Sequence, residues 1–152
     1  MNAKAMDAIA LLTGDHREVE ELFEQFEKLG ERANAKKKQI ADQICTALMV
    51  HARIEEELFY PAAREAVKDA GDLLDEAEVE HASAKDLILQ IQEMDPEDEL
   101  YDAKVKVLSE QIEHHVKEEE KEMFPKVKKS KLDLVALADE MVVRKDELIA
   151  TT

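Results

Sequence analysis

Apolar residues recur along this chain in alternating steps of three and four, the spacing at which side chains share one face of an α-helix. Turn and breaker residues divide the pattern into five segments. We expect helices over residues 7–29, 35–68, 72–93, 96–128 and 131–150. In this interpretation Gly30 ends the first helix, and Pro96 takes the first position of the fourth.

The connections between the predicted helices are short, so consecutive helices are expected to lie antiparallel. The predicted fold class is all-α: an up-down-up-down four-helix bundle over residues 7–128, with an additional C-terminal helix over residues 131–150. The 152 residues suffice for a single domain around one core. The last helix carries an apolar row that is expected to cap the bundle or to form a homodimer contact. This row consists of Leu134, Leu137, Met141 and Leu148.

Composition supports helices and restricts the partners. Three glycines and three prolines are few for a sheet fold. Lys and Arg number 21 against 37 Asp and Glu, and the net charge of −16 disfavours binding to nucleic acid or to a membrane surface. Cys45 is the single cysteine, which excludes an intrachain disulfide and favours a reducing, cytoplasmic location. No stretch reaches the roughly 20 apolar residues that span a bilayer.

A repeated motif connects the two predicted hairpins. The first copy contains His51, Glu55, Tyr60 and Pro61, and the second contains His115, Glu119, Phe124 and Pro125 at the same spacing. A further histidine precedes each copy on the helix before it. His16 lies 35 residues before His51, and His81 lies 34 residues before His115. Each hairpin thus carries one histidine followed by a His-x3-Glu pair.

These histidines and glutamates fall on the apolar faces of their helices. His16, for example, follows Leu12 by four residues and precedes Val19 by three. Within each His-x3-Glu pair the side chains point the same way, because residues four apart lie about 6 Å from each other on one helix face. Buried carboxylates without partners are costly, and a metal would supply the compensating charge. The predicted metal ligands are His16, His51, Glu55, His81, His115 and Glu119.

Imidazole nitrogens and carboxylate oxygens without thiolates suit iron, manganese or zinc, whereas magnesium and calcium prefer oxygen throughout. Two ions fit six such side chains better than one. If both glutamates bridge, each ion receives two imidazoles and two carboxylate oxygens, and a bridging oxide or hydroxide takes a fifth position. One position on each ion then stays open for water, dioxygen, peroxide or nitric oxide. We therefore expect two iron ions, with manganese or zinc as substitutes.

The order His, His-x3-Glu, His, His-x3-Glu resembles that of the hemerythrin-like family, also called the HHE cation-binding domain. The resemblance covers residues 7–128, and the aromatic-Pro pairs that follow each motif strengthen it. It implies a non-haem di-iron centre in a four-helix bundle, in a family whose members carry or sense oxygen, respond to iron or nitric oxide, or break down peroxide. The chain departs from the oxygen-carrying hemerythrins, which use five histidine ligands and an aspartate. Lys85 stands where a further histidine is expected and Glu119 where the aspartate is, which disfavours reversible oxygen carriage.

Other residues near the motif allow two interpretations. His114 is rotated by about 100° from His115 around the helix, which favours a surface position over a role as a fifth histidine ligand. Glu56 and Glu120 are expected to be solvated or to support the ligands from outside, with movement onto the metal as the alternative. Cys45 is expected to be a packed thiol rather than a redox-active one. A further set is expected to pack in the core, with the wall of a gas pocket as the alternative. This set comprises Phe23, Phe26, Phe59, Tyr60, Met123 and Phe124.

Three hypotheses about function follow. The favoured one is a sensor or binding protein for oxygen, nitric oxide or peroxide at the metal pair. The second is a di-iron enzyme that decomposes peroxide in the manner of a catalase or reduces oxygen. The third is a metal-free helical module whose polar interior residues only direct packing with a protein partner. Haem held by paired histidines is a minor alternative, because the two inward glutamates would then have no role.

Overall fold

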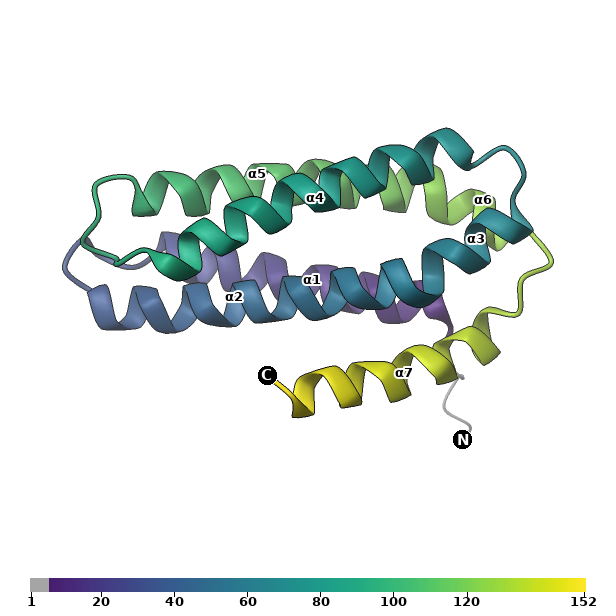
Figure 1. Cartoon of the computed structure of the whole chain (residues 1–152), viewed down its shortest axis with the longest axis horizontal. Coiled ribbons are helices and arrows are strands. Elements are labelled where there is room, and N and C mark those ends of the chain that lie inside the picture. The colour runs from purple at the N-terminus through teal and green to yellow at the C-terminus, as the bar shows by residue number, and fades with distance from the viewer. Residues whose placement is uncertain (1–5) are drawn as a thin grey trace.

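The structure is a computed structural model, and it describes residues 6–152 of the chain. Its elements are α1 (Ala8–Glu27), α2 (Asn34–Ile54), η1 (Glu55–Phe59), α3 (Tyr60–Ala66), α4 (Gly71–Glu93), α5 (Tyr101–Glu118), η2 (Glu119–Met123), α6 (Phe124–Lys128) and α7 (Leu134–Ala150). All regular structure in this part of the chain is helical, which confirms the predicted all-α class. Figure 1 shows α1, α2, α4 and α5 side by side along the long axis, with α7 lying against α1 and α2.

Two residues that were predicted to mark helix ends, Gly30 and Pro96, do not do so. The first helix ends before Gly30, which does not adopt a positive φ angle, so this glycine does not cap the helix in a left-handed conformation. Pro96 does not begin the fourth helix, because it lies in a loop in which Asp98 accepts hydrogen bonds from backbone N–H groups on both sides. Helix α5 begins only at Tyr101, whose fully buried ring anchors the start of the helix in the core.

The second and fourth predicted helices each contain a π-helical turn that ends two residues before a proline. In η1 the N–H of Tyr60 donates to the carbonyl of Glu55, five residues earlier, and in η2 the N–H of Phe124 donates to Glu119 in the same way. The following proline has no N–H, so it cannot complete the regular hydrogen-bond ladder, and the chain accommodates the wider turn at this point. Both π turns begin at the glutamate of a His-x3-Glu pair.

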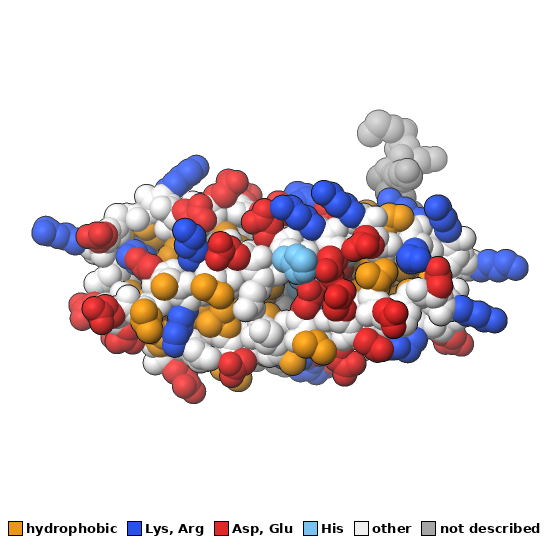
Figure 2. Space-filling view, turned by 90° about the horizontal axis from the view of Figure 1, so that it is seen from above, with side chains coloured by type: hydrophobic (Ala, Val, Ile, Leu, Met, Phe, Trp, Pro, Cys, Tyr) orange, Lys and Arg blue, Asp and Glu red, His pale blue; other side chains and the backbone are white. Residues whose placement is uncertain are grey.

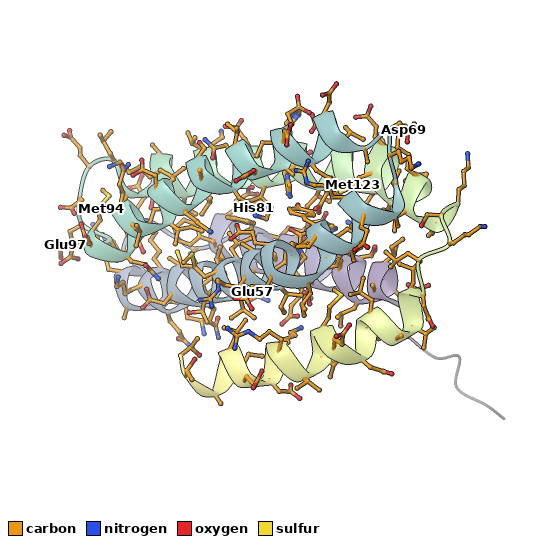
Figure 3. All side chains as sticks on the ribbon, turned by 45° about the vertical axis from the view of Figure 1, so that its right-hand side comes forward. Glu57, Asp69, His81, Met94, Glu97 and Met123 are labelled. Carbon is orange, nitrogen blue, oxygen red and sulfur yellow. The ribbon has the colours of Figure 1, made fainter. Side chains whose placement is uncertain are left out.

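The apolar core is divided into two clusters of buried side chains. One joins the start of α1, the end of α2 and the start of α4 to η1, α3, α6 and α7, and includes Leu12, Ile54 and Leu74. The other joins the remainder of α1 to the early parts of α2 and α5, and includes Val19 and Ile44. Figure 3 shows side chains, His81 and Met123 among them, filling the space between the helices. The buried histidines occur in the sequence between residues of the two clusters, so they form a polar layer within an apolar interior.

Helix α7 covers one side of the bundle. It begins at Leu134, three residues later than predicted, and the side chain of Asp133 caps it by accepting a hydrogen bond from the backbone of the first turn. Its residues Leu137, Met141 and Leu148 are buried in the first apolar cluster, so the apolar row predicted for this helix packs on the bundle. The molecular surface in Figure 2 is rich in acidic side chains. None of the helices within residues 6–152 is long and apolar enough to cross a membrane.

Candidate metal centre

All six side chains predicted as metal ligands are buried and converge in the middle of the bundle. His16 comes from α1, His81 from α4, and each His-x3-Glu pair spans the junction between a long helix and its π turn. Their ligand atoms form two groups, each with all atoms within 4.8 Å of one another. The first group contains His16, His51, Glu55 and Glu119, and the second contains Glu55, His81 and His115. Glu55 thus belongs to both groups.

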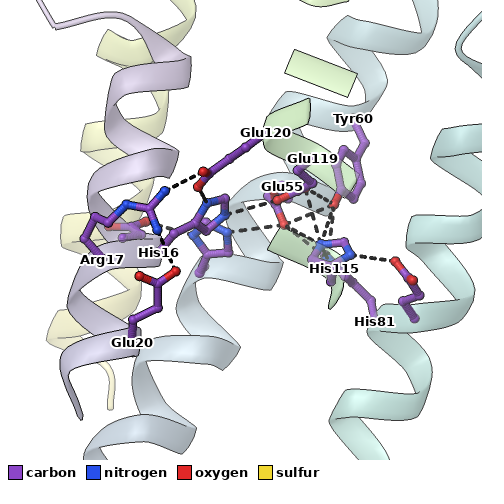
Figure 4. Close-up of polar contacts among 12 residues, drawn as sticks. His16, Arg17, Glu20, Glu55, Tyr60, His81, His115, Glu119 and Glu120 are labelled. Atoms are coloured by element: carbon purple, nitrogen blue, oxygen red, sulfur yellow. Dashed lines mark hydrogen bonds and ion pairs between the residues drawn. The ribbon is translucent and has the colours of Figure 1, made fainter. Parts of the chain in front are cut away.

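The two glutamates lie between the imidazole rings, as Figure 4 shows. Glu55 Oε1 lies 3.1 Å from Nε2 of His81 and 3.4 Å from Nε2 of His51. Glu119 reaches His16 with one oxygen, at 3.1 Å, and His115 with the other, at 3.3 Å. Each carboxylate therefore contacts histidines of both hairpins, which is the arrangement required of a bridging ligand.

Each of the four rings is fixed from outside by another carboxylate. The Nδ1 atoms of His16, His81 and His115 each lie 2.7 Å from a glutamate oxygen, and that of His51 lies 2.9 Å from an aspartate oxygen. The outer carboxylates belong, in the same order, to Glu120, Glu56, Glu80 and Asp15. Because an ionised carboxylate only accepts hydrogen bonds, Nδ1–H donates and Nε2 faces the centre. Glu56 and Glu120 thus hold His81 and His16 from outside, the position that the sequence interpretation favoured, whereas the contacts of Asp15 and Glu80 were not predicted.

Three of these outer carboxylates form ion pairs with fixed cations. Arg17 pairs with Glu120, Lys85 with Glu56 at 2.7 Å, and Lys145 of α7 with Asp15 at 2.8 Å. Lys85 thus supports His81 indirectly, through Glu56. Within residues 6–152, the fourth outer carboxylate, Glu80, pairs with no lysine or arginine, and the exposed imidazole of His114 lies 3.5 Å from it.

Tyr60 is a residue of the centre that the sequence interpretation assigned to core packing. Its hydroxyl donates to Glu119 at 2.5 Å and lies 3.1 Å from Glu55 Oε1. The same oxygen is 3.2 Å from Nε2 of both His81 and His115. The π turn explains this position, because its five-residue hydrogen bond stacks Tyr60 one turn above Glu55. The spacing of a tyrosine five residues after the glutamate, directly before a proline, was the available sequence signal.

The repeat makes the two halves of the centre unequal at this point. The second hairpin has Phe124 where the first has Tyr60, and the Phe124 ring stacks on His16 with centroids 6.0 Å apart. One half therefore presents a hydroxyl to the buried donors and the other half an apolar ring. Burial and the charges of Glu55 and Glu119 raise the pKa of Tyr60 well above its usual value, so the hydroxyl keeps its proton.

Without a metal, the buried carboxylates favour the protonated form of three imidazoles, those of His51, His81 and His115. Burial lowers the pKa of His51, but the charge of Glu55 and the hydrogen bond to Asp15 outweigh it and raise the pKa to about 10. The pKa of His115 is raised in the same way, chiefly by Glu119, and that of His81 by Glu55. Burial raises the pKa of Glu55, but His51 and its other partners lower it well below the usual range. Buried charge of both signs is therefore present before any cation binds.

The buried donor atoms do not all satisfy one another by hydrogen bonding, and a cation would supply the missing partner. Nε2 of His51 and Oε2 of Glu55 are buried without a hydrogen-bond partner among residues 6–152. Orphaned polar atoms are costly in an interior, and both of these belong to the candidate ligand set. Imidazole nitrogen with carboxylate oxygen is a donor combination typical of iron, manganese and zinc. The cluster is therefore able to bind metal.

We expect the metal-free protein to lose stability as the pH rises from about 7 to about 10. The folded-state pKa of His51, about 10, lies above its ordinary value of 6.5, so the ion pairing it contributes is complete below pH 6.5 and is lost as the pH rises through the folded-state value. The loss should be on the order of a few kcal/mol. Thermal unfolding measured across this pH range tests this, with the metal-loaded protein as the control, since imidazoles bound to metal are already neutral. An equal melting temperature at pH 7 and pH 10 would contradict the assignment.

A cavity of about 320 Å³ adjoins the centre. Its walls come from α1, α2, α4 and α5 and are largely apolar, with Val19, Leu48, Ala84, Ile88 and Ile112 among them, and all four buried histidines also line it. None of the six side chains considered for a gas pocket lines this cavity. All six pack in the two apolar clusters, as predicted, and Tyr60 in addition places its hydroxyl in the centre.

The remaining candidates lie outside the centre. The His114 side chain is 67% exposed on α5 and does not join the two buried groups, so its predicted surface position is confirmed. It forms a separate His/Glu group with Glu80 and Glu118. Cys45 is buried in the second apolar cluster, and burial raises the pKa of its thiol to about 11, as expected of a packed cysteine.

Fold and site together define an all-helical protein with a buried histidine–glutamate cluster able to bind metal. The family model described as the hemerythrin HHE cation binding domain matches residues 7–127, so the chain belongs to this family. A solved hemerythrin HHE cation binding domain-containing protein from Mycobacterium kansasii has a similar structure, with a TM-score of 0.81 and 23% sequence identity over 96% of this chain and 89% of the other. At this identity the likeness supports the fold alone. No curated protein matches the chain.

Proposed function

We propose that this chain is a non-haem di-iron protein whose ions are held by the six buried side chains, with Glu55 and Glu119 as bridges. The proposed ligands are His16, His51, Glu55, His81, His115 and Glu119. One observation carries the proposal: two compact groups of donor atoms share Glu55, and two of their buried atoms, His51 Nε2 and Glu55 Oε2, lack a hydrogen-bond partner among residues 6–152. The proposal includes a single domain over the 152 residues, with an up-down-up-down four-helix bundle over residues 7–128.

Iron at this centre would supply a redox-active cation with a position open to a small ligand. Manganese and zinc suit the same donors, but zinc has no redox chemistry. The chain's own residues orient the site. The outer carboxylates direct each imidazole Nε2 inward, and the Tyr60 hydroxyl holds a proton beside Glu119 and Glu55. Apolar walls next to the donors restrict water.

The cavity indicates which ligands fit. A largely apolar chamber that reaches all four histidines favours small uncharged molecules over charged metabolites. Oxygen, nitric oxide and hydrogen peroxide meet this requirement. We therefore favour a binding or sensing role for such a ligand, with turnover of peroxide as the enzymatic alternative, which the protonated Tyr60 hydroxyl in the centre favours.

Narrowing the cavity should slow ligand binding without changing the iron content. Ala84 lines the cavity one helical turn from His81, so Ala84→Leu is expected to slow nitric oxide binding by about tenfold or more. Stopped-flow absorbance of the iron-loaded protein measures this rate. The matched control is Ala82→Leu, the same change at an exposed position of α4.

Three outcomes distinguish the functional hypotheses. A protein that takes up neither iron nor manganese or zinc would leave only the metal-free interaction module. If Ala84→Leu binds iron and its rate of nitric oxide binding is unchanged, the cavity is not the path by which the ligand reaches the metal. Sustained oxygen evolution after peroxide is added, beyond stoichiometric oxidation of the iron, would assign the enzymatic alternative.

A further inference from the structure

A second His/Glu group lies on the surface formed by α4 and α5. Nε2 of His114 is 2.9 Å from a Glu118 oxygen and 3.5 Å from a Glu80 oxygen, and the three ligand atoms lie within 4.8 Å of one another. Figure 2 shows a histidine on this upper face with acidic side chains around it. The group combines one imidazole with two carboxylates from two neighbouring helices.

The internal repeat shows what is unusual about this group. Asp15 and Glu80 occupy equivalent positions, each directly before the first histidine of its hairpin, and each holds the Nδ1 of a buried ligand. Asp15 receives its cation, Lys145, from α7, which covers that side of the bundle. Among residues 6–152, no lysine or arginine forms an ion pair with Glu80 or Glu118. Beside Glu80, the position that corresponds to Lys145 is therefore open to solvent.

The second hairpin also differs from the first at the neighbouring positions. By the spacing of the repeat, His114 and Glu118 correspond to Val50 and Ile54, both of which are buried in the first apolar cluster. The repeat therefore changes from two apolar residues to two metal-ligating residues where no helix covers the surface. Together with Glu80, these residues place two carboxylates beside an imidazole without a fixed cation.

We propose that His114, Glu80 and Glu118 bind a divalent transition-metal cation. This cation neutralises the negative charge of Glu80, as Lys145 neutralises that of Asp15. The imidazole favours zinc, iron(II) or manganese(II) over magnesium and calcium, and water fills the remaining coordination positions. The site is distinct from the buried centre but next to it, because the other oxygen of Glu80 lies 2.7 Å from His115 Nδ1. Both Glu80 and His114 line the cavity, so a cation at this site lies at the edge of the space that leads to the buried donors.

Zinc titration of the iron-loaded protein tests this site. Isothermal calorimetry should detect one zinc ion per chain beyond the metals of the centre, with the iron content measured before and after to exclude displacement. His114→Ala and Glu118→Gln should each weaken this binding by about tenfold or more, because each removes a ligand. Glu113→Gln is the matched control, since this exposed acid of α5 pairs with Lys117 and lies outside the group. Because His114 is largely exposed, its replacement should leave helicity and iron content unchanged.

The test of the surface site does not depend on whether the buried centre binds iron. If the buried centre retains no iron, wild-type protein and His114→Ala are titrated with zinc in parallel, and a difference of one ion per chain supports the surface site. Broadening of the NMR signals of residues 114 and 118 by manganese(II) places the ion directly. Equal zinc stoichiometry and affinity in wild type and His114→Ala would overturn the proposal.

Discussion

Replacing Glu55 with glutamine is expected to abolish binding of both metal ions, the largest effect predicted for any single substitution. Glu55 is fully buried and is the one side chain shared by the two groups of donor atoms. Glutamine has nearly the same shape but lacks the negative charge, and its NH2 group would face Nε2 atoms that should bind the metal. Iron measured after loading and desalting should fall from about two ions per chain to well below one.

The control for this substitution is Glu122→Gln, which makes the same change at an exposed position within a π turn. It should retain the iron content of the wild type. Circular dichroism should show the same helicity in both variants, since glutamine preserves helix propensity. A Glu55→Gln protein that kept two tightly bound ions would show that the ligand assignment is wrong.

Removing the metal is expected to lower the melting temperature by roughly 10 °C or more. A ligand present at a thousand times its dissociation constant stabilises the folded state by about 4 kcal/mol per site, and each kcal/mol corresponds to about 2–4 °C in a domain of this size. The physical source lies in the buried charges of the centre. Without a metal, the buried carboxylates have only imidazole protons as counter-charges, which raises the pKa of His81 and His115 although their ring centroids lie 4.9 Å apart.

Calorimetric unfolding with and without a chelator measures this difference. The Glu55→Gln variant serves as the control, because its melting temperature should not respond to iron or to chelator. A wild-type melting temperature that stayed unchanged after complete removal of metal would favour the metal-free interaction module.

The residues of the centre that the sequence revealed are those whose position depends on one helix alone. The three-and-four spacing places His16 on the same face as Leu12 and Val19, and that face is buried in the structure. The four-residue spacing likewise fixes the relation of His51 to Glu55. Such relations follow from helix geometry and need no knowledge of how the helices pack.

The hydrogen bonds that orient these histidines could not be predicted, because they join residues far apart in the chain. His16 and Glu120 are separated by 104 positions, and His51 and Asp15 by 36. Many acidic residues in this chain could have accepted these hydrogen bonds, and only the packing of the helices determines which of them do. The same holds for the ion pair between Lys145 and Asp15, which depends on where α7 lies.

By itself, the sequence determined the helical class, the repeat and the six buried polar positions, because the period of an α-helix converts spacing directly into direction. The tertiary structure decided the rest. It placed the Tyr60 hydroxyl among the ligands through a π turn, left Glu80 without a fixed cation, and opened an apolar cavity beside the histidines. These features depend on distances between helices, which the spacing of residues within one helix does not encode.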